Sequence, residues 1–272
     1  MEYGTWFMWP RPIGRESVTF VEGDDGARYV AWQASGYNLW EWYRPMEDRP
    51  ALYRDFVSLV VDGDDVDAAF RMLGPLDATW QKSVGLQGTF DEYREPVAYW
   101  LHNREVMAGV LDLHDALVKV PREPGAVAEI MDTPREHALL IPHGESVPGS
   151  LAFGVQNAVG DEGLPLFEHA EEAITRVVNY QMQDRVAFTM RRDAGKLGAL
   201  SLDVQPTSLL GAMWLMLSRE LMGNVATEPC KHCGKWFSMN ASSVKRGKRF
   251  CSDKCRVDAH RKKNPVKGGE TK

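Results

Sequence analysis

The sequence predicts an α+β protein: a body of mixed helices and antiparallel strands, followed by a small C-terminal zinc finger. Three observations support this class. Apolar residues recur at helical spacing over long stretches, short apolar runs separated by turn residues indicate hairpins, and all four cysteines lie in the last 45 of the 272 residues. With 44% hydrophobic residues, a chain of this length can bury a substantial core.

The first 49 residues carry no helical period. Two runs rich in β-branched and aromatic residues, 18–21 and 29–32, flank the turn sequence Glu-Gly-Asp-Asp-Gly and predict a hairpin. The aromatic residues of 40–43 continue the extended pattern. We therefore expect strands in this part of the chain.

From Pro50 the period becomes helical. The apolar residues at 52, 56, 59 and 60 share one helix face, and Asp64-Asp65 precedes a second helix over 66–73. We expect helix through about residue 120, and its strongest segment is 97–118, with Pro96 in its first turn.

The second half of the body mixes both periods. Strands are expected at 137–141 and 150–155, a helix from 166 to about 183, and a hairpin of 185–192 with 200–204. The helix at 206–222 is the most apolar in the chain, so its face must be buried against the body or against a second subunit.

The cysteines form two close pairs with the pattern C-x2-C-x17-C-x3-C, which consists of Cys230, Cys233, Cys251 and Cys255. This spacing is typical of structural zinc sites, in which four thiolates complete a tetrahedron and leave no open position. A disulfide pairing is disfavoured in a reducing compartment. His232 and His260 are alternative ligands, although four cysteines already complete the shell.

The residues around the cysteines predict a treble clef. Gly234 suits the turn of a knuckle, residues 235–237 form a strand, and residues 248–250 form a second strand that leads into a helix. Ser252 is the expected N-cap of that helix, which runs to Lys263. A zinc ribbon would instead place the second pair in another hairpin.

The net charge of −6 is divided unevenly along the chain. Residues 1–227 carry −15, whereas residues 228–272 carry 13 Lys+Arg and four Asp+Glu, a charge of +9. A basic segment beside an acidic body suggests a nucleic-acid partner, and the alternatives are a solubilising tail or one that folds back on the body. The cysteine cluster in the same segment favours nucleic acid, with duplex DNA first. The candidate contacts are Lys245, Arg246, Lys248, Arg249, Arg256, Arg261, Lys262 and Lys263.

The finger resembles that of the bacterial CGNR (ABATE-like) zinc-finger proteins. The resemblance rests on Cys-x2-Cys-Gly-Lys-Trp-Phe and Arg-Phe-Cys-Ser-x2-Cys-Arg-x2-Ala-His-Arg-Lys-Lys over 228–263, and more faintly on the helix from Ser208 to Glu220. It implies a stress-linked transcription regulator with a ligand-binding N-terminal domain. The tetrad itself is absent, because Cys255-Arg256-Val257-Asp258 replaces Cys-Gly-Asn-Arg, so a sister group with the same architecture is the better assignment.

These observations define three expected segments: a body over 1–227 that senses a ligand or dimerises, a finger over 228–264 and a disordered basic tail over 265–272. No phosphate loop, dinucleotide fingerprint, nucleophile elbow or metalloprotease motif occurs, so we expect no enzyme. No signal peptide or membrane span is expected, which predicts a cytoplasmic protein. The alternative function is a protein- or RNA-interaction module; a nuclease would need catalytic histidines around a second metal.

Overall fold

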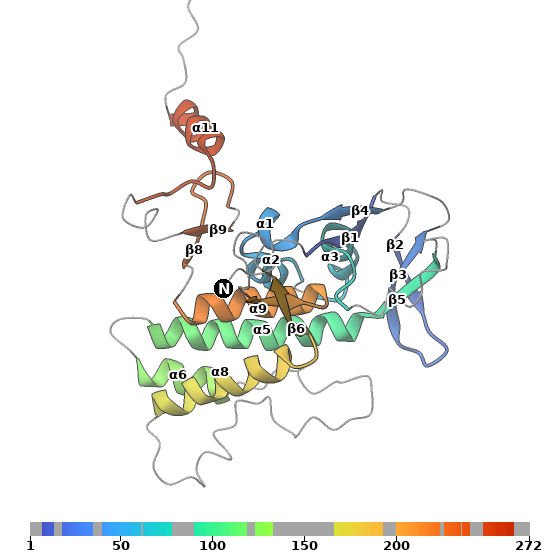
Figure 1. The fold of residues 1–272 in the computed structure, drawn as a ribbon, viewed down its shortest axis with the longest axis horizontal. Coiled ribbons are helices and arrows are strands. Elements are labelled where there is room, and N and C mark those ends of the chain that lie inside the picture. Colours follow the sequence, from blue (N-terminus) through green and yellow to red (C-terminus); the bar gives the residue numbers. More distant parts are fainter. Residues whose placement is uncertain are drawn as a thin grey trace, which may run out of the picture.

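The fold is α+β, as the sequence predicts (Figure 1). The computed structural model describes residues 7–13, 18–34, 40–60, 62–77, 90–118, 123–132, 166–192, 200–223, 226–234, 236–239 and 247–263. The helices are α1 (Pro45–Asp48), α2 (Leu52–Leu59), α3 (Val66–Leu73), α5 (Val97–Val118), α6 (Pro124–Asp132), α8 (Leu166–Met182), α9 (Leu209–Leu221) and α11 (Asp253–Lys263).

The described strands form four small antiparallel sheets. Their members are β1 (Trp9–Pro12) with β4 (Trp40–Tyr43), β2 (Val18–Glu22) with β3 (Arg28–Ala34) and β5 (Phe90–Pro96), β6 (Val186–Arg192) with β7 (Leu200–Pro206), and β8 (Ala226–Pro229) with β9 (Trp236–Met239). Each sheet is too small to enclose a core by itself. The buried side chains of the body strands must therefore pack against helices.

The core of the body lies among the helices. Helix α5 contacts α2, α6 and α8, while α9 contacts α2 and α8, and the three-stranded sheet lies at one end of α5 (Figure 1). Buried residues surround α5 on most of its circumference, as expected of a helix that other elements enclose. Trp100 of α5 packs against Phe56 of α2 and Phe70 of α3, which joins the first helices to the centre.

Most of the expected elements are confirmed. The first hairpin is β2–β3, residues 40–43 form β4, and the helices expected at 66–73 and 97–118 have those bounds. The helix expected at 206–222 begins at Leu209, because Pro206 ends β7 and the Ser208 hydroxyl accepts a bond from the Gly211 N–H at 3.0 Å. Its apolar residues are buried within the body. The predictions for 137–141, 150–155 and 265–272 lie outside the described residues.

Two expectations about the first 120 residues are wrong. The helix expected to continue up to residue 120 is interrupted by β5, which pairs with β3. Pro96 ends this strand rather than lying in the first turn of α5, and its ring disfavours helical dihedrals at Glu95. The short helix α1 also lies within the segment expected to contain only strands.

Glu95 is the most buried carboxylate of the described residues, with 2% of its surface exposed. One oxygen accepts bonds from the Tyr93 hydroxyl and the Asp77 N–H, at 2.8 and 2.9 Å, and the other from the Trp100 indole and the Leu76 N–H, at 2.8 and 3.0 Å. Burial raises the pKa of Glu95 to about 7, against the opposing effect of these four donors. The side chain ties the segment after α3 to both β5 and α5.

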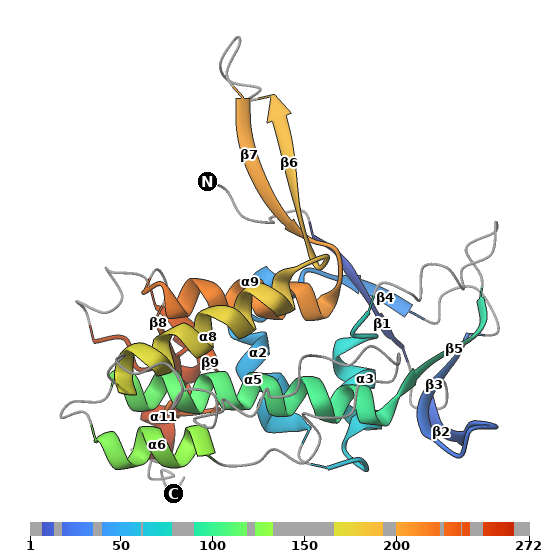
Figure 2. The same cartoon turned by 90° about the horizontal axis from the view of Figure 1, so that it is seen from below.

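The β6–β7 hairpin extends away from the helices (Figure 2). Its base is fixed between the end of α8 and the start of α9. The Thr207 N–H donates to the Arg185 carbonyl at 2.9 Å, and a side chain at Gly211 would collide with that same carbonyl oxygen. The end of α8 and the start of α9 therefore hold the hairpin at its base.

Candidate metal centre

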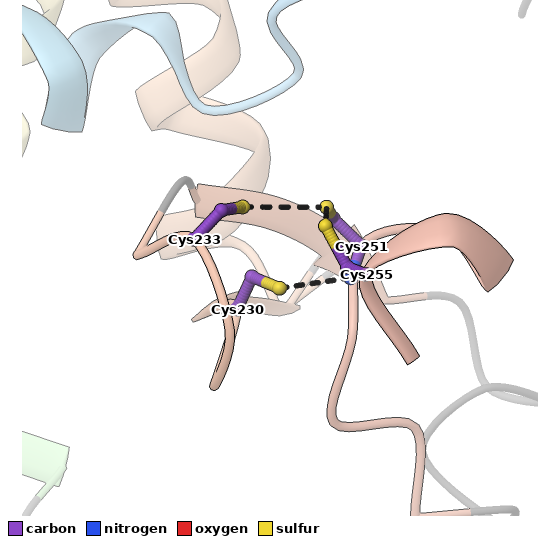
Figure 3. Close-up of side chains that lie close together, drawn as sticks. All are labelled: Cys230, Cys233, Cys251 and Cys255. Carbon is purple, nitrogen blue, oxygen red and sulfur yellow. Dashed lines mark hydrogen bonds between the residues drawn. The ribbon is translucent and has the colours of Figure 1, made fainter. Parts of the chain in front are cut away.

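The four cysteine sulfurs gather at one point of the finger (Figure 3). All four atoms lie within 4.8 Å of one another and could hold a metal ion. The Cys251 sulfur is 3.7 Å from that of Cys233 and 3.5 Å from that of Cys255, and the Cys251 N–H donates to the Cys230 sulfur at 3.4 Å. Within the part of the chain that the structure describes, neither His232 nor His260 joins this group.

The first cysteine pair lies in the turn between β8 and β9. The Gly234 N–H donates to the Cys230 carbonyl at 2.9 Å, and this closure needs the φ of +73° that glycine adopts without strain. A bond of 3.0 Å from the Lys231 N–H to the Arg249 carbonyl ties this turn to the segment before the second pair. The knuckle and its glycine are where the sequence places them.

The second pair lies at the start of α11. The Ser252 hydroxyl accepts a bond from the Cys255 N–H at 3.2 Å, which is the N-cap expected from the sequence. The strand expected over 248–250 is not formed, because these residues pair with no strand and only Arg249 bonds back to the knuckle. The hairpin of the finger is instead β8–β9, on either side of the first pair.

Two neighbouring aromatic residues of β9 serve different cores. Phe237 packs with Cys230 and Met239 in a small finger core, to which Phe250 adds a partly buried ring. Trp236 packs against the large core of the body. The two side chains reach different cores because strand alternation sends consecutive side chains to opposite faces.

The thiols of the cluster differ in their tendency to ionise. Burial works against ionisation of Cys230, but N–H groups of Cys233, Cys251 and His232 stabilise its thiolate and lower its pKa to about 6. Burial, with the neighbouring sulfurs of Cys255, Cys233 and Cys230, raises the pKa of Cys251 to about 12. A cation between the sulfurs would favour the thiolate at each position.

Arg54 of α2 joins the finger to the body. Its guanidinium donates to Glu220, in the last turn of α9, at 2.5 Å and to Thr227 of β8 at 3.1 Å, and it lies 4.6 Å from the centre of the Trp236 ring. The side chains of Arg54 and Glu220 are only 12% and 10% exposed. The sequence offered no signal for this contact, because its partners lie more than 160 positions away.

Replacing Arg54 by Met is expected to lower the free energy of unfolding by about 3 kcal/mol, because Glu220 would remain buried without its cation. Urea denaturation at neutral pH measures this loss. The control is Arg176→Met, whose pair with Glu172 is exposed and whose removal should change stability by less than about 1 kcal/mol. Equal effects of the two changes would contradict the role assigned to Arg54.

Several of the predicted nucleic-acid contacts surround the second cysteine pair. Lys248, Arg249 and Arg256 line a hollow of about 660 Å³ at the start of α11. Arg256 also pairs with Asp253 at 3.1 Å, and Lys248 lies 5.2 Å from the centre of the Phe237 ring. Two of the remaining candidates, Arg261 and Lys262, are exposed side chains on α11. The side chains of the other three, Lys245, Arg246 and Lys263, lie outside the described part of the structure.

An apolar groove of about 540 Å³ lies in the body between α5, α8 and the last turn of α9. Its apolar lining includes Leu117, Ile174, Val178 and Leu221. Polar groups border it as well, among them Asn179, so its chemistry suits a largely apolar molecule with few polar groups. The sequence did not reveal this groove, because its lining comes from three helices that are distant in the chain.

Among the described residues, no helix combines the length and the apolar character that crossing a membrane requires. Comparison with known proteins finds no matching family model, no similar curated protein and no similar solved structure.

Proposed function

We propose that the four cysteines bind one structural Zn²⁺. Zinc–thiolate bonds of about 2.3 Å in a tetrahedron place sulfur atoms about 3.8 Å apart, and the distances of 3.5 and 3.7 Å from Cys251 are close to this value. Four soft ligands leave no open position, so the ion holds the finger together and performs no catalysis.

We infer that the finger contacts nucleic acid, with duplex DNA as the first candidate. The observation that carries this proposal is the hollow at the start of α11, which three cationic residues line beside the metal ligands. Four thiolates and one Zn²⁺ contribute −2, so the +9 of residues 228–272 becomes +7. Phosphates are the ligands that such a surface attracts most strongly.

Helix α11 supports the same proposal. Its side chains are mostly exposed, including Arg256, Arg261 and Lys262, and it has no continuous apolar face to pack on the body. A helix that is polar all round gains little from burial. Metal coordination at its first turn would keep it folded, and its cationic side chains would remain available to a polyanion.

The body would then be the regulatory part of a transcription regulator. Its apolar groove supports the binding of a small ligand, because the groove borders the last turn of α9, the helix that leads into β8 and the finger. The resemblance of the finger to CGNR proteins implies the same arrangement. The alternative is that the finger binds protein or RNA.

Binding to duplex DNA should weaken steeply with salt, by about 10³–10⁵ between 50 and 200 mM for six to ten phosphate contacts. Replacing Arg256, Arg261 or Lys262 by Ala should each lower the slope of log affinity against log salt by about 1. Fluorescence anisotropy with zinc-loaded protein and a labelled duplex measures both effects, and Arg176→Ala on the body is the matched control.

The same titration with single-stranded DNA and structured RNA separates the candidates. Tighter binding to RNA would favour the alternative function. Salt-independent binding, or no binding to any of the three, would remove nucleic acid as the partner. If Arg261→Ala and Arg176→Ala gave equal slopes of log affinity against log salt, the contact surface would not include Arg261 on α11.

A further inference from the structure

The apolar groove between α5, α8 and the last turn of α9 leaves large apolar side chains in contact with solvent. Val118 and Met222, which belong to its lining, are 59% and 60% exposed. Its volume of about 540 Å³ lies within the range of about 300–1,000 Å³ that is usual for small-molecule sites. Exposed apolar side chains that border a hollow of this size are typical of a binding site.

The charges around the groove are mainly negative. Among the described residues that line it there is no Lys or Arg, and Glu171 is the only Asp or Glu. Glu172 pairs with Arg176 at 2.8 Å, whereas the carboxylate of Glu171 has no cationic partner in the described part of the chain. Asp115 follows the lining residue His114, and α8 carries three Glu against one Arg. The groove therefore lies in a negative potential, which attracts cations.

The neutral polar groups of the lining offer acceptors more than donors. The hydroxyls of Thr175 and Ser218 each donate to a carbonyl of their own helix at 2.9 Å, so each can offer a ligand only a lone pair. The other polar groups of the lining are the Asn179 amide and the His114 ring. The His114 Nδ1 lies 3.5 Å from a carboxylate oxygen of Asp115. An anion that approached this ring would therefore also approach a negative charge.

We propose that the groove binds an organic cation, a molecule with an apolar body and one positive charge, and that the charge lies beside Glu171. The apolar lining, which includes Leu117, Val178 and Leu221, would cover the body of the molecule. An attraction between unit charges about 4 Å apart in water corresponds to roughly fivefold in affinity. Apolar contact would therefore supply most of the affinity, and the charge would select the class of ligand. The proposal rests on the ligand-binding role proposed for the body and is independent of the partner of the finger.

Tetraphenylphosphonium and tetraphenylborate test the proposal, because these two ions have nearly the same size and shape but opposite charges. Isothermal titration calorimetry of the full chain at low salt, with Zn²⁺ supplied, measures both affinities. Tetraphenylphosphonium should bind at least about tenfold more tightly, since reversal of the ligand charge turns the attraction to Glu171 into repulsion.

Three variants locate the bound cation. Glu171→Gln should weaken the binding of tetraphenylphosphonium about fivefold and should not weaken that of tetraphenylborate. The matched control is Glu172→Gln, which removes the same charge at the next position, outside the described lining, and should change either affinity less than about twofold. Met222→Ser should weaken the binding of both ions, because it removes apolar contact from each. Circular dichroism checks that each variant is folded.

Three results would overturn the proposal. Equal affinities for the two ions would show a groove that binds ligands without selecting charge, so the body would keep its proposed role and only the ligand class would be wrong. If neither ion bound, the ligand class and the role of the groove would both be wrong. Equal weakening by Glu171→Gln and Glu172→Gln would place the cation elsewhere on the acidic body.

Discussion

If the cysteines bind Zn²⁺ as proposed, removal of the ion is expected to unfold the second half of the finger and leave the body folded. Structural zinc contributes about 10–16 kcal/mol to the folding of small fingers, whereas the apolar core of this finger contains only three buried residues among those described. A chelator, or Cys251→Ser, should therefore melt α11 and release the knuckle. The β8–β9 hairpin should keep its contact with the body, since Trp236 packs on the body core.

Backbone hydrogen exchange measured by mass spectrometry resolves this expectation along the chain. Peptides from 247–263 should lose protection after chelation, while peptides from α5 and α9 keep it. Return of protection when Zn²⁺ is added back is the control for irreversible damage. Cooperative loss of protection throughout the body would show that the metal supports the whole fold.

Replacement of Glu95 by Leu is expected to lower the free energy of unfolding by about 3–5 kcal/mol, because buried donors would lose their acceptor. These donors are the N–H groups of Leu76 and Asp77, the Tyr93 hydroxyl and the Trp100 indole. Glu95→Gln keeps one acceptor oxygen and should have an intermediate effect. Chemical denaturation of the wild type and the two variants measures the order of their stabilities. Equal stability of the Leu variant and the wild type would contradict the role of Glu95 as the acceptor for these donors.

The raised pKa of Glu95 predicts that the free energy of unfolding depends on pH. The pKa of Glu95 is about 7 in the folded protein and 4.5 in the reference state, so between these values the folded state binds more protons than the unfolded state. Its contribution to stability is therefore present below about pH 4.5 and is lost as pH rises through 7, by about 3 kcal/mol in total. The difference in stability between wild type and Glu95→Gln should shrink over this window, and a widening difference would contradict the raised pKa.

Local patterns predicted most of the elements but few of the contacts between them. Helices 66–73 and 97–118 could be predicted because their apolar residues repeat with the helical period. Strand β5 was missed because a buried carboxylate beside a proline resembles neither a regular strand nor a helix. The four-cysteine cluster was predictable because ligand spacing is local within each pair.

The parts of the site that the sequence did not reveal depend on distant residues. In the sequence, Arg54 cannot be distinguished from an ordinary surface charge on a helix. It joins the finger to the body because α2 packs beside the end of α9 and the start of β8. The groove likewise depends on which helices are neighbours. The alternation of 186–192 was visible in the sequence, but the exposure of Phe188 and Met190 was not.

Arg54 provides a physical link through which metal binding at the cysteines and ligand binding in the body could be coupled. Glu220, Thr227 and Trp236 each contact Arg54, so the last turn of α9 and the finger hairpin share one side chain. If filling the groove beside that turn strengthens this contact, it must raise the affinity of the cysteines for metal, and metal binding must raise the affinity of the groove for its ligand by the same factor. The protein would then integrate two inputs, the supply of metal and the supply of ligand, in a single equilibrium.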